Sequence, residues 1–195
     1  MLNQFLTDPV SAYYWLVGLL IAITFHEAAH AFVADRLGDL TPRYQGRLTL
    51  NPLAHLDPIG TILLFLVGFG WGKPVMFNPL SFRNPALSAT FISLAGPLTN
   101  LIIALICATL IRTGVAPLNL WVQIALINII LGVFNLIPIS PLDGEKVVAG
   151  LLPPELRLEW ANFQRFGFIV LIVIIFTGGP ILSSLVTSIF RILVG

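Results

Sequence analysis

Residues 12–34 form an apolar run in which the only formally charged side chain is Glu27. The run is close in length to the roughly 20 residues that an α-helix needs to cross a lipid bilayer. The charge lies within the motif HEAAH at residues 26–30, so two histidines accompany it. Ionisable groups inside a membrane helix are costly unless they face a protein interior and have partners. The run therefore predicts a membrane-spanning helix that carries a polar site.

The spacing of the two histidines suits a metal ion. Residues four apart share one face of a helix, so His26 and His30 can both direct an imidazole nitrogen at one zinc ion. Glu27 can then take a proton from water at the ion, which is the chemistry of zinc-dependent hydrolysis. The same pattern also occurs by chance on exposed helices, although the apolar setting argues against this. A polar cluster that serves an ion or proton path is a further alternative.

The composition extends the membrane setting to the whole chain. Of the 195 residues, 57% are hydrophobic and 10% are charged, and the mean hydropathy is +0.95. These values are typical of a polytopic membrane protein and exclude an ordinary soluble domain. The net charge of +1, without a basic tract, gives no indication of nucleic-acid binding. The single cysteine, Cys107, excludes an intrachain disulfide.

The apolar segments predict one membrane-embedded, all-α domain over residues 1–195, with a three-helix core and one or two further C-terminal helices. The apolar stretch 59–71 is too short for a comfortable span and ends in closely spaced glycines, so we expect a re-entrant segment. The tail 181–194 could cross the membrane, lie on its surface or pack as a half-helix. The expected spans are residues 12–34, 87–111, 120–142 and 163–180.

Charges after the first span predict its orientation. Arginine exceeds aspartate over residues 35–47, and a positive excess marks the cytoplasmic end of a span. The polar site would then lie nearer the cytoplasmic side, with His30 roughly 8 Å below the interface at 1.5 Å per helical residue. Residues 46–51, GRLTLN, alternate as a short strand does, and a plain loop fits them equally well.

A third metal ligand is expected at the end of the third span. A catalytic zinc keeps three protein ligands and leaves one position for water. Asp143 follows Pro138 and Pro141, which break the helix and can turn the aspartate toward the ion. A helix-end aspartate at the membrane surface is the plain alternative. If Asp143 is a ligand, the first and third spans run in the same direction, so the stretch 59–71 must turn back.

Three motifs together resemble one known family. HEAAH in the first span, SLAGPLTN in the second and NLIPISPLDG at the end of the third are similar to the signature of the site-2 protease family of intramembrane zinc metalloproteases. The resemblance extends through GRLTLNPLAHLDPIG and WGKPVMFNP, so it covers about residues 18–150. The parallel is with the small prokaryotic members that are little more than the catalytic core.

The resemblance implies a role for each polar residue of the motifs. His26, His30 and Asp143 would bind one Zn²⁺ per chain, and Glu27 would be the general base. The segment 46–51 would correspond to the membrane-associated β element that engages substrate in the family.

The same resemblance implies the substrate contacts and the setting. The asparagine that matches Asn100 is thought to hold the substrate or the transition state, and Asn135 belongs to the signature segment of the third span. From the residues alone, Asn100 could equally form a helix-to-helix hydrogen bond. Substrates would be single-pass membrane proteins in the plasma membrane of a prokaryotic cell. We expect neither the PDZ domain nor the CBS domain that many members carry.

Two other classes of protein remain open at this point. A transporter or metal carrier could use the same polar cluster, although the sequence shows no internal repeat of the kind that many transporters have. A catalytically inactive scaffold could bind membrane helices, although it would more often have lost Glu27. Replacing Glu27 with glutamine separates these classes, because only a protease would keep its metal and lose cleavage.

Overall fold

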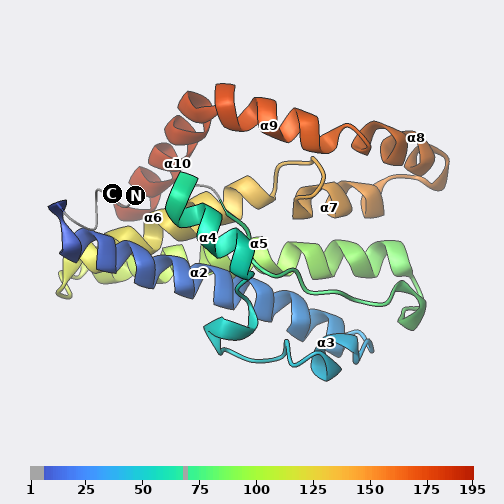
Figure 1. The fold of residues 1–195 in the computed structure, drawn as a ribbon, viewed down its shortest axis with the longest axis horizontal. Helices are drawn as coiled ribbons and strands as arrows, with labels where there is room; N and C mark the ends of the chain where they lie inside the picture. The colour runs from blue at the N-terminus through green and yellow to red at the C-terminus, as the bar shows by residue number, and fades with distance from the viewer. Residues whose placement is uncertain (1–6, 68–69) are drawn as a thin grey trace.

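A computed structural model describes residues 7–67 and 70–195, and three long helices form its centre. These are α2 (Pro9–Arg36), α5 (Pro85–Arg112) and α6 (Leu118–Asn135). Each of them packs against the other two, and Figure 1 shows them running side by side. Among the described residues, these three helices are individually long and apolar enough to cross a membrane. The predicted class, an all-α polytopic membrane protein, is confirmed.

Glycines set how closely these helices approach one another. Gly18 of α2 faces α6, where a Cβ atom would lie 2.9 Å from Ile127 Cδ1 and 3.3 Å from Ile124 Cα. Gly132 of α6 faces α5, where a Cβ would lie 3.1 Å from the carbonyl oxygen of Pro97. Helices in lipid associate through such close packing, since burial of apolar surface gains little there.

The two longest helices begin in the same way, at a polar cap followed by proline. Asp8 accepts a hydrogen bond from Ser11 N at 3.1 Å, and Asn84 accepts one from Leu87 N at 3.2 Å. The proline that follows each cap has no N–H to leave unpaired in the first helical turn. The residues at which α2 and α5 begin are therefore set by the adjacent sequence, and not by contacts with other helices.

The segment around α4 (Pro58–Val67) folds back toward its own start. Gly70 and Trp71 lie directly against Gly60, and a Cβ on either glycine would collide with the backbone of the other segment. The chain therefore enters and leaves this region at one place, which is the path that the predicted re-entrant segment 59–71 requires. Residues 68 and 69 of that prediction lie outside the described residues, and its depth in a membrane stays a prediction.

Of the two conformations that fit residues 46–51, a short strand and a plain loop, the structure has the loop. In the described part of the chain, β pairing is confined to one isolated antiparallel bridge between Leu56 and Gly72. Asn51 instead accepts a backbone hydrogen bond that caps the 3₁₀ helix η1 (Pro52–Ala54). Such local side-chain hydrogen bonds favour a turn over a strand ladder.

The third predicted span ends earlier than residue 142. The helix α6 stops at Asn135, because Pro138 and Pro141 cannot donate the backbone hydrogen bonds that would continue it. Residues 136–142 form a loop, and α7 (Asp143–Leu151) then packs against α5.

The fourth predicted span, 163–180, is part of a bent pair of helices. The axis turns by 62° between α8 (Pro154–Gln164) and α9 (Gly167–Thr177). Figure 1 shows α9 crossing above the central helices before α10 (Gly179–Val194) returns to them. Val186 of α10 packs with buried residues of α5 and α6, so the tail is a packed helix.

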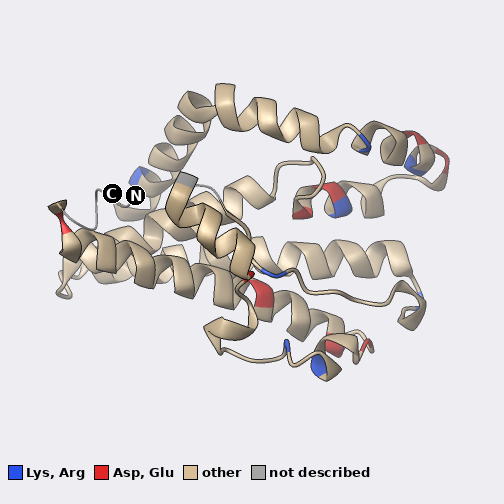
Figure 2. Ribbon diagram, in the orientation of Figure 1, with Lys and Arg blue, Asp and Glu red and all other residues tan. Residues whose placement is uncertain are grey.

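Charged residues lie mainly at the ends of the long helices, in the connections and in the short helices α7 and α8, with Glu27 inside α2 as an exception (Figure 2). The helices α6 and α9 carry no charged residue, and the one charge of α5 is its last residue, Arg112. Arg112 Nε donates to the carbonyl oxygen of Val194 at 2.9 Å, which joins the ends of α5 and α10.

A buried aspartate fixes the connection after α2. Asp39 accepts hydrogen bonds from both N and Oγ1 of Thr41, from Asn78 N and from Ser81 Oγ. Burial raises the pKa of Asp39, but these hydrogen bonds outweigh it and hold the pKa below its ordinary value. The short helices of this region are α3 (Thr41–Tyr44) and η2 (Pro79–Ser81).

Candidate metal centre

Two helices bring three potential ligands together. Nε2 of His26 and Nε2 of His30, both on α2, lie 3.1 and 3.2 Å from the same oxygen, Oδ2 of Asp143. Among the described residues, this is the one group of His, Cys, Asp and Glu side chains whose ligand atoms all lie within 4.8 Å of one another. Both histidines are buried, and Asp143 is partly buried.

The spacing of these atoms fits a tetrahedral zinc site. Zinc binds nitrogen and oxygen ligands at about 2.0–2.1 Å, which places tetrahedral ligands roughly 3.3–3.4 Å apart. The observed separations are within about 0.3 Å of that value. Gly96 of α5 leaves the space beside the imidazoles open: a Cβ there would lie 2.5 Å from His30 Nε2 and 2.7 Å from His26 Nε2. The residues therefore fit a bound zinc ion.

Hydrogen bonds on the far side of each ring select the nitrogen that faces the centre. Nδ1 of His30 lies 2.6 Å from the carbonyl oxygen of Ile92, which can only accept, so Nδ1 carries a hydrogen. Nδ1 of His26 lies 2.6 Å from Oδ1 of Asn100 and donates to it. In neutral imidazoles, each Nε2 then has a free lone pair. Two lone pairs and a carboxylate oxygen that converge in this way suit a cation.

The loop after α6 presents the aspartate. Gln164 of α8 holds this loop, because its Oε1 accepts from Ser140 N at 2.8 Å and its Nε2 donates to Pro138 O at 3.0 Å. Gly144 faces the carbonyl groups of Leu136 and Ile137, just after α6, where a Cβ would collide with them. The helix α7 can therefore begin directly against this part of the loop, and its first residue, Asp143, turns toward α2.

Glu27 lies beside this cluster, and a hydrogen bond from the segment after α4 holds its carboxylate. Its Oε2 accepts a hydrogen bond from Val75 N at 3.1 Å. The segment that carries Val75 is fixed in turn, since Lys73 N donates to His55 O at 2.8 Å and the buried Arg47 donates to Lys73 O. Burial lowers the pKa of Arg47, and the nearby carboxylate of Glu27 opposes that shift. Two connecting segments thus meet over the candidate base.

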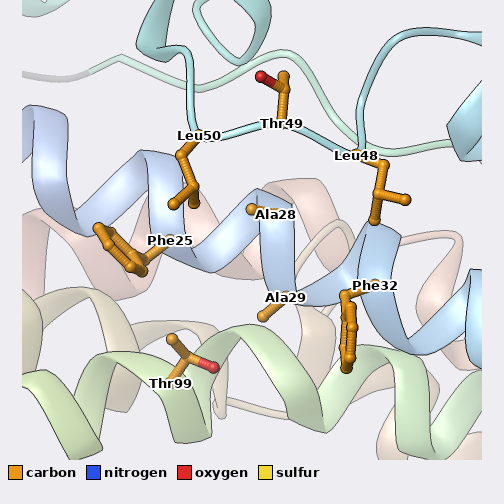
Figure 3. Close-up of a pocket in the computed structure, with 8 residues that line it drawn as sticks. All are labelled: Phe25, Ala28, Ala29, Phe32, Leu48, Thr49, Leu50 and Thr99. Carbon is orange, nitrogen blue, oxygen red and sulfur yellow. The ribbon is translucent and has the colours of Figure 1, made fainter.

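An apolar groove of about 430 Å³ lies along α2, on residues within and beside the HEAAH motif. Figure 3 shows residues 48–50 passing over α2 on one side of it and Thr99 of α5 on the other. Two of its walls, Ala28 and Ala29, directly follow Glu27 in the sequence. The lining residues are Phe25, Ala28, Ala29, Phe32, Leu48, Thr49, Leu50 and Thr99.

The two asparagines expected to contact substrate are placed differently from each other. Asn100 is fully buried behind His26, and its Nδ2 donates to Ala22 O and to Asn128 Oδ1. Its amide is therefore occupied in holding a histidine and two helices, and the structure gives it no exposed face. Asn135 donates to a carbonyl oxygen of its own helix, and its contact with substrate stays a prediction.

Four residues that shape the site could not be predicted from the sequence to do so. Gly96 lay within the small-residue stretch SLAGPLTN, and only its place beside His26 and His30 shows why it is glycine. In the sequence Arg47 serves only as a topology signal, and its burial against the backbone of Ala54 and Lys73 appears only in the structure. Asn128 and Gln164 gave no signal beyond being polar residues in or beside apolar segments.

Comparisons with known proteins point to one family. Residues 112–178 match the sequence model described as peptidase family M50. The Bacillus subtilis protein named "Putative zinc metalloprotease YwhC" is 40% identical over 192 residues, which cover 90% of this chain and 86% of that protein. "Putative zinc metalloprotease Rip2" of Mycolicibacterium smegmatis is 31% identical over 172 residues, or 83% of this chain and 66% of that protein. No solved structure matches the chain.

Proposed function

Because the chain belongs to peptidase family M50, the site-2 protease family, we propose that it is a zinc metalloprotease that cuts peptide bonds within or near transmembrane helices. One observation carries the proposal. Two histidines of an apolar, membrane-length helix and an aspartate from a distant helix start converge on one point, with a glutamate beside them. Hydrolysis at such a site would act on substrates that lie in the membrane.

Each polar residue has a separate task in this proposal. His26, His30 and Asp143 would hold the zinc ion, which would supply Lewis acidity toward a peptide carbonyl and toward water. Glu27 accepts the proton of the attacking water and later delivers a proton to the leaving amine. The N–H of Val75 orients the Glu27 carboxylate for both transfers.

The substrate must be unwound before it can react. A helical carbonyl is engaged in a hydrogen bond to the residue four positions on and is shielded by its own side chains. The groove between α2 and residues 48–50 offers apolar walls for an unwound segment along the helix that carries Glu27. We therefore assign this groove to the substrate, and we expect helix-breaking residues in a substrate to favour cleavage.

We also propose that the end of α2, and the metal centre near it, lie on the cytoplasmic side of the plasma membrane. The support for this orientation is the excess of arginine over aspartate directly after the helix. Tyr44 is 82% exposed in this connection. A Tyr44→Cys variant should react with an impermeant thiol reagent only after the cells are opened. Reaction in intact cells would reverse the proposed orientation.

The test of function is cleavage by protein reconstituted into vesicles. The substrate is a single-pass membrane protein that carries a glycine-proline pair within its span. Glu27→Gln should lower the cleavage rate by at least about 100-fold, the usual contribution of a general base, while the zinc content stays unchanged. Glu159→Gln, at an exposed position of α8, serves as the matched control and should cleave normally. Undiminished cleavage by Glu27→Gln would refute the proposed mechanism.

A further inference from the structure

A line of hydrogen bonds runs from α6 through α5 to the metal centre. It begins at Asn128, whose Nδ2 donates to the carbonyl oxygen of Ile124 at 2.8 Å. Nδ2 of Asn100 donates to Asn128 Oδ1 at 2.8 Å, and Nδ1 of His26 donates to Asn100 Oδ1 at 2.6 Å. Both asparagines are fully buried, and His26 is 5% exposed. Water therefore cannot substitute for these partners.

The backbone fixes the direction of every bond in this line. An asparagine amide has nearly the same shape when it is flipped, so only its partners decide where its oxygen points. The carbonyl oxygen of Ile124 can only accept, so Asn128 must present Nδ2 to it and Oδ1 to Asn100. The carbonyl oxygen of Ala22 is a second acceptor for Asn100 Nδ2, at 3.0 Å. Asn100 is thereby left with its oxygen toward His26.

This direction decides which nitrogen of His26 can bind a metal. A hydrogen on Nδ1 leaves the lone pair on Nε2, the atom that lies 3.1 Å from Asp143 Oδ2. A flipped Asn100 would present N–H groups to Nδ1, and the ring hydrogen would then favour Nε2. A protonated Nε2 cannot ligate zinc.

Packing alone does not explain an asparagine at position 128. A leucine has the same branched arrangement of side-chain heavy atoms and no polar group to remove from water, whereas a buried amide costs free energy unless all its partners are in place. The neighbouring Ile129 shows what packing requires on this helix, since it is fully buried among apolar residues of α5 and α10. The amide at position 128 has a polar task instead.

We propose that Asn128 is a positioning residue of the metal centre, which acts through Asn100 to hold His26 in the orientation and tautomer that leave Nε2 free for zinc. The inference rests on the proposed zinc site and adds a residue that never touches the ion. Residues that orient ligating histidines typically contribute 10- to 100-fold to metal affinity.

The test compares variants that differ at this one amide. Asn128→Leu removes both hydrogen bonds and keeps the branched side-chain shape, whereas Asn128→Asp, as a neutral carboxylic acid, keeps an oxygen for Asn100 to donate to and a hydrogen for the carbonyl oxygen of Ile124. Ile129→Ala is the control for lost packing on the same helix. Zinc affinity is measured by competition with a chelator on detergent-purified protein, and the visible spectrum of the cobalt-substituted protein reports ligand geometry. If Asn128→Leu does not fold, Asn128→Ala replaces it.

Asn128→Leu should weaken zinc binding by about 10- to 100-fold and alter the cobalt spectrum. Asn128→Asp and Ile129→Ala should stay within about threefold of the native chain and keep its spectrum. Native zinc affinity and a native cobalt spectrum in folded Asn128→Leu would overturn the inference and leave the proposed zinc site unaffected. Equal weakening of zinc binding in the leucine and aspartate variants would overturn it in the same way. A folded native chain that binds no zinc would overturn the proposed function as well.

Discussion

The change Gly96→Ala places one methyl group at the metal centre. The added Cβ would lie 2.5 Å from His30 Nε2 and 2.7 Å from His26 Nε2, whereas ordinary van der Waals contacts are 3.4–4 Å. To restore an ordinary contact, the nitrogen of His30 must retreat by about 0.9 Å and that of His26 by about 0.7 Å. Metal–ligand distances tolerate only about 0.2 Å. The methyl group and a correctly coordinated zinc ion are therefore incompatible.

The expected result is a loss of zinc without loss of the fold. Both imidazoles are displaced at once, so we expect the zinc affinity to fall by more than about 100-fold, beyond the range typical of changes around the ligands. Elemental analysis after dialysis against a weak chelator gives the zinc content per chain. The helix content from circular dichroism should stay close to that of the native protein, because alanine favours a helix over glycine.

Gly18→Ala is the matched control for this experiment. It adds the same methyl group to another helix interface, where the nearest atom, Ile127 Cδ1, is 2.9 Å away and belongs to the end of a flexible side chain. Gly18 is two helical turns from His26, so its variant should keep zinc and lose at most some stability. A Gly96→Ala protein with a full complement of zinc would refute the assigned position of the ion.

Three further changes have expected outcomes of their own. The pKa of Asp39 is depressed in the folded chain, so as the pH falls the unfolded chain takes up a proton first and the folded state loses stability. Below about pH 4 the melting temperature should therefore drop more steeply in the native chain than in Asp39→Asn, and parallel curves of melting temperature against pH would contradict this. Gln164→Leu frees the loop before Asp143, so chelator titration should show about tenfold weaker zinc binding, and an unchanged affinity would contradict the role of the loop. Ala28→Phe fills the groove and should lower the cleavage rate by about tenfold or more while the zinc content stays unchanged. Leu80→Phe, at an exposed position, should cleave at the native rate, and equal cleavage rates in the two variants would remove the groove as the substrate site.

The parts of the site that the sequence predicted are those that depend on local geometry. His26 and His30 share a helix face by their spacing, and the apolar run around them marks that helix without knowledge of the rest of the chain. Asp143 was identified through the ligand count of zinc together with two prolines that end a helix. The structure brings all three together as that reasoning expected.

The features of the site that the sequence does not predict depend on contacts between segments that are distant in the chain. The bond between Asn100 and His26 joins residues 74 positions apart, and the bond between Asn100 and Asn128 joins residues 28 apart. No periodicity links such pairs. The helix-to-helix hydrogen bond left open for Asn100 is present, whereas its bond to a histidine could not be predicted, and the substrate role implied by the resemblance stays a prediction.

Segment boundaries failed where side-chain caps and prolines compete with hydropathy. Residues 136–142 are apolar enough to extend the third span, but two prolines turn them into the loop that carries the candidate ligand. The alternation in residues 46–51 suggested a strand, although the cap at Asn51 turns the chain. In both places the hydropathy of the residues indicates how apolar their surroundings are. Their backbone conformation depends instead on which local hydrogen bonds can form.

Zinc content is the most direct test of the central claim, which is a three-ligand zinc site completed by Asp143. The detergent-purified native chain is compared with His30→Ala, Asp143→Ala and Glu27→Gln. The account predicts one zinc ion per chain in the native protein and in Glu27→Gln, and almost none in the two alanine variants. A folded native chain without zinc, or full zinc in Asp143→Ala, would contradict it.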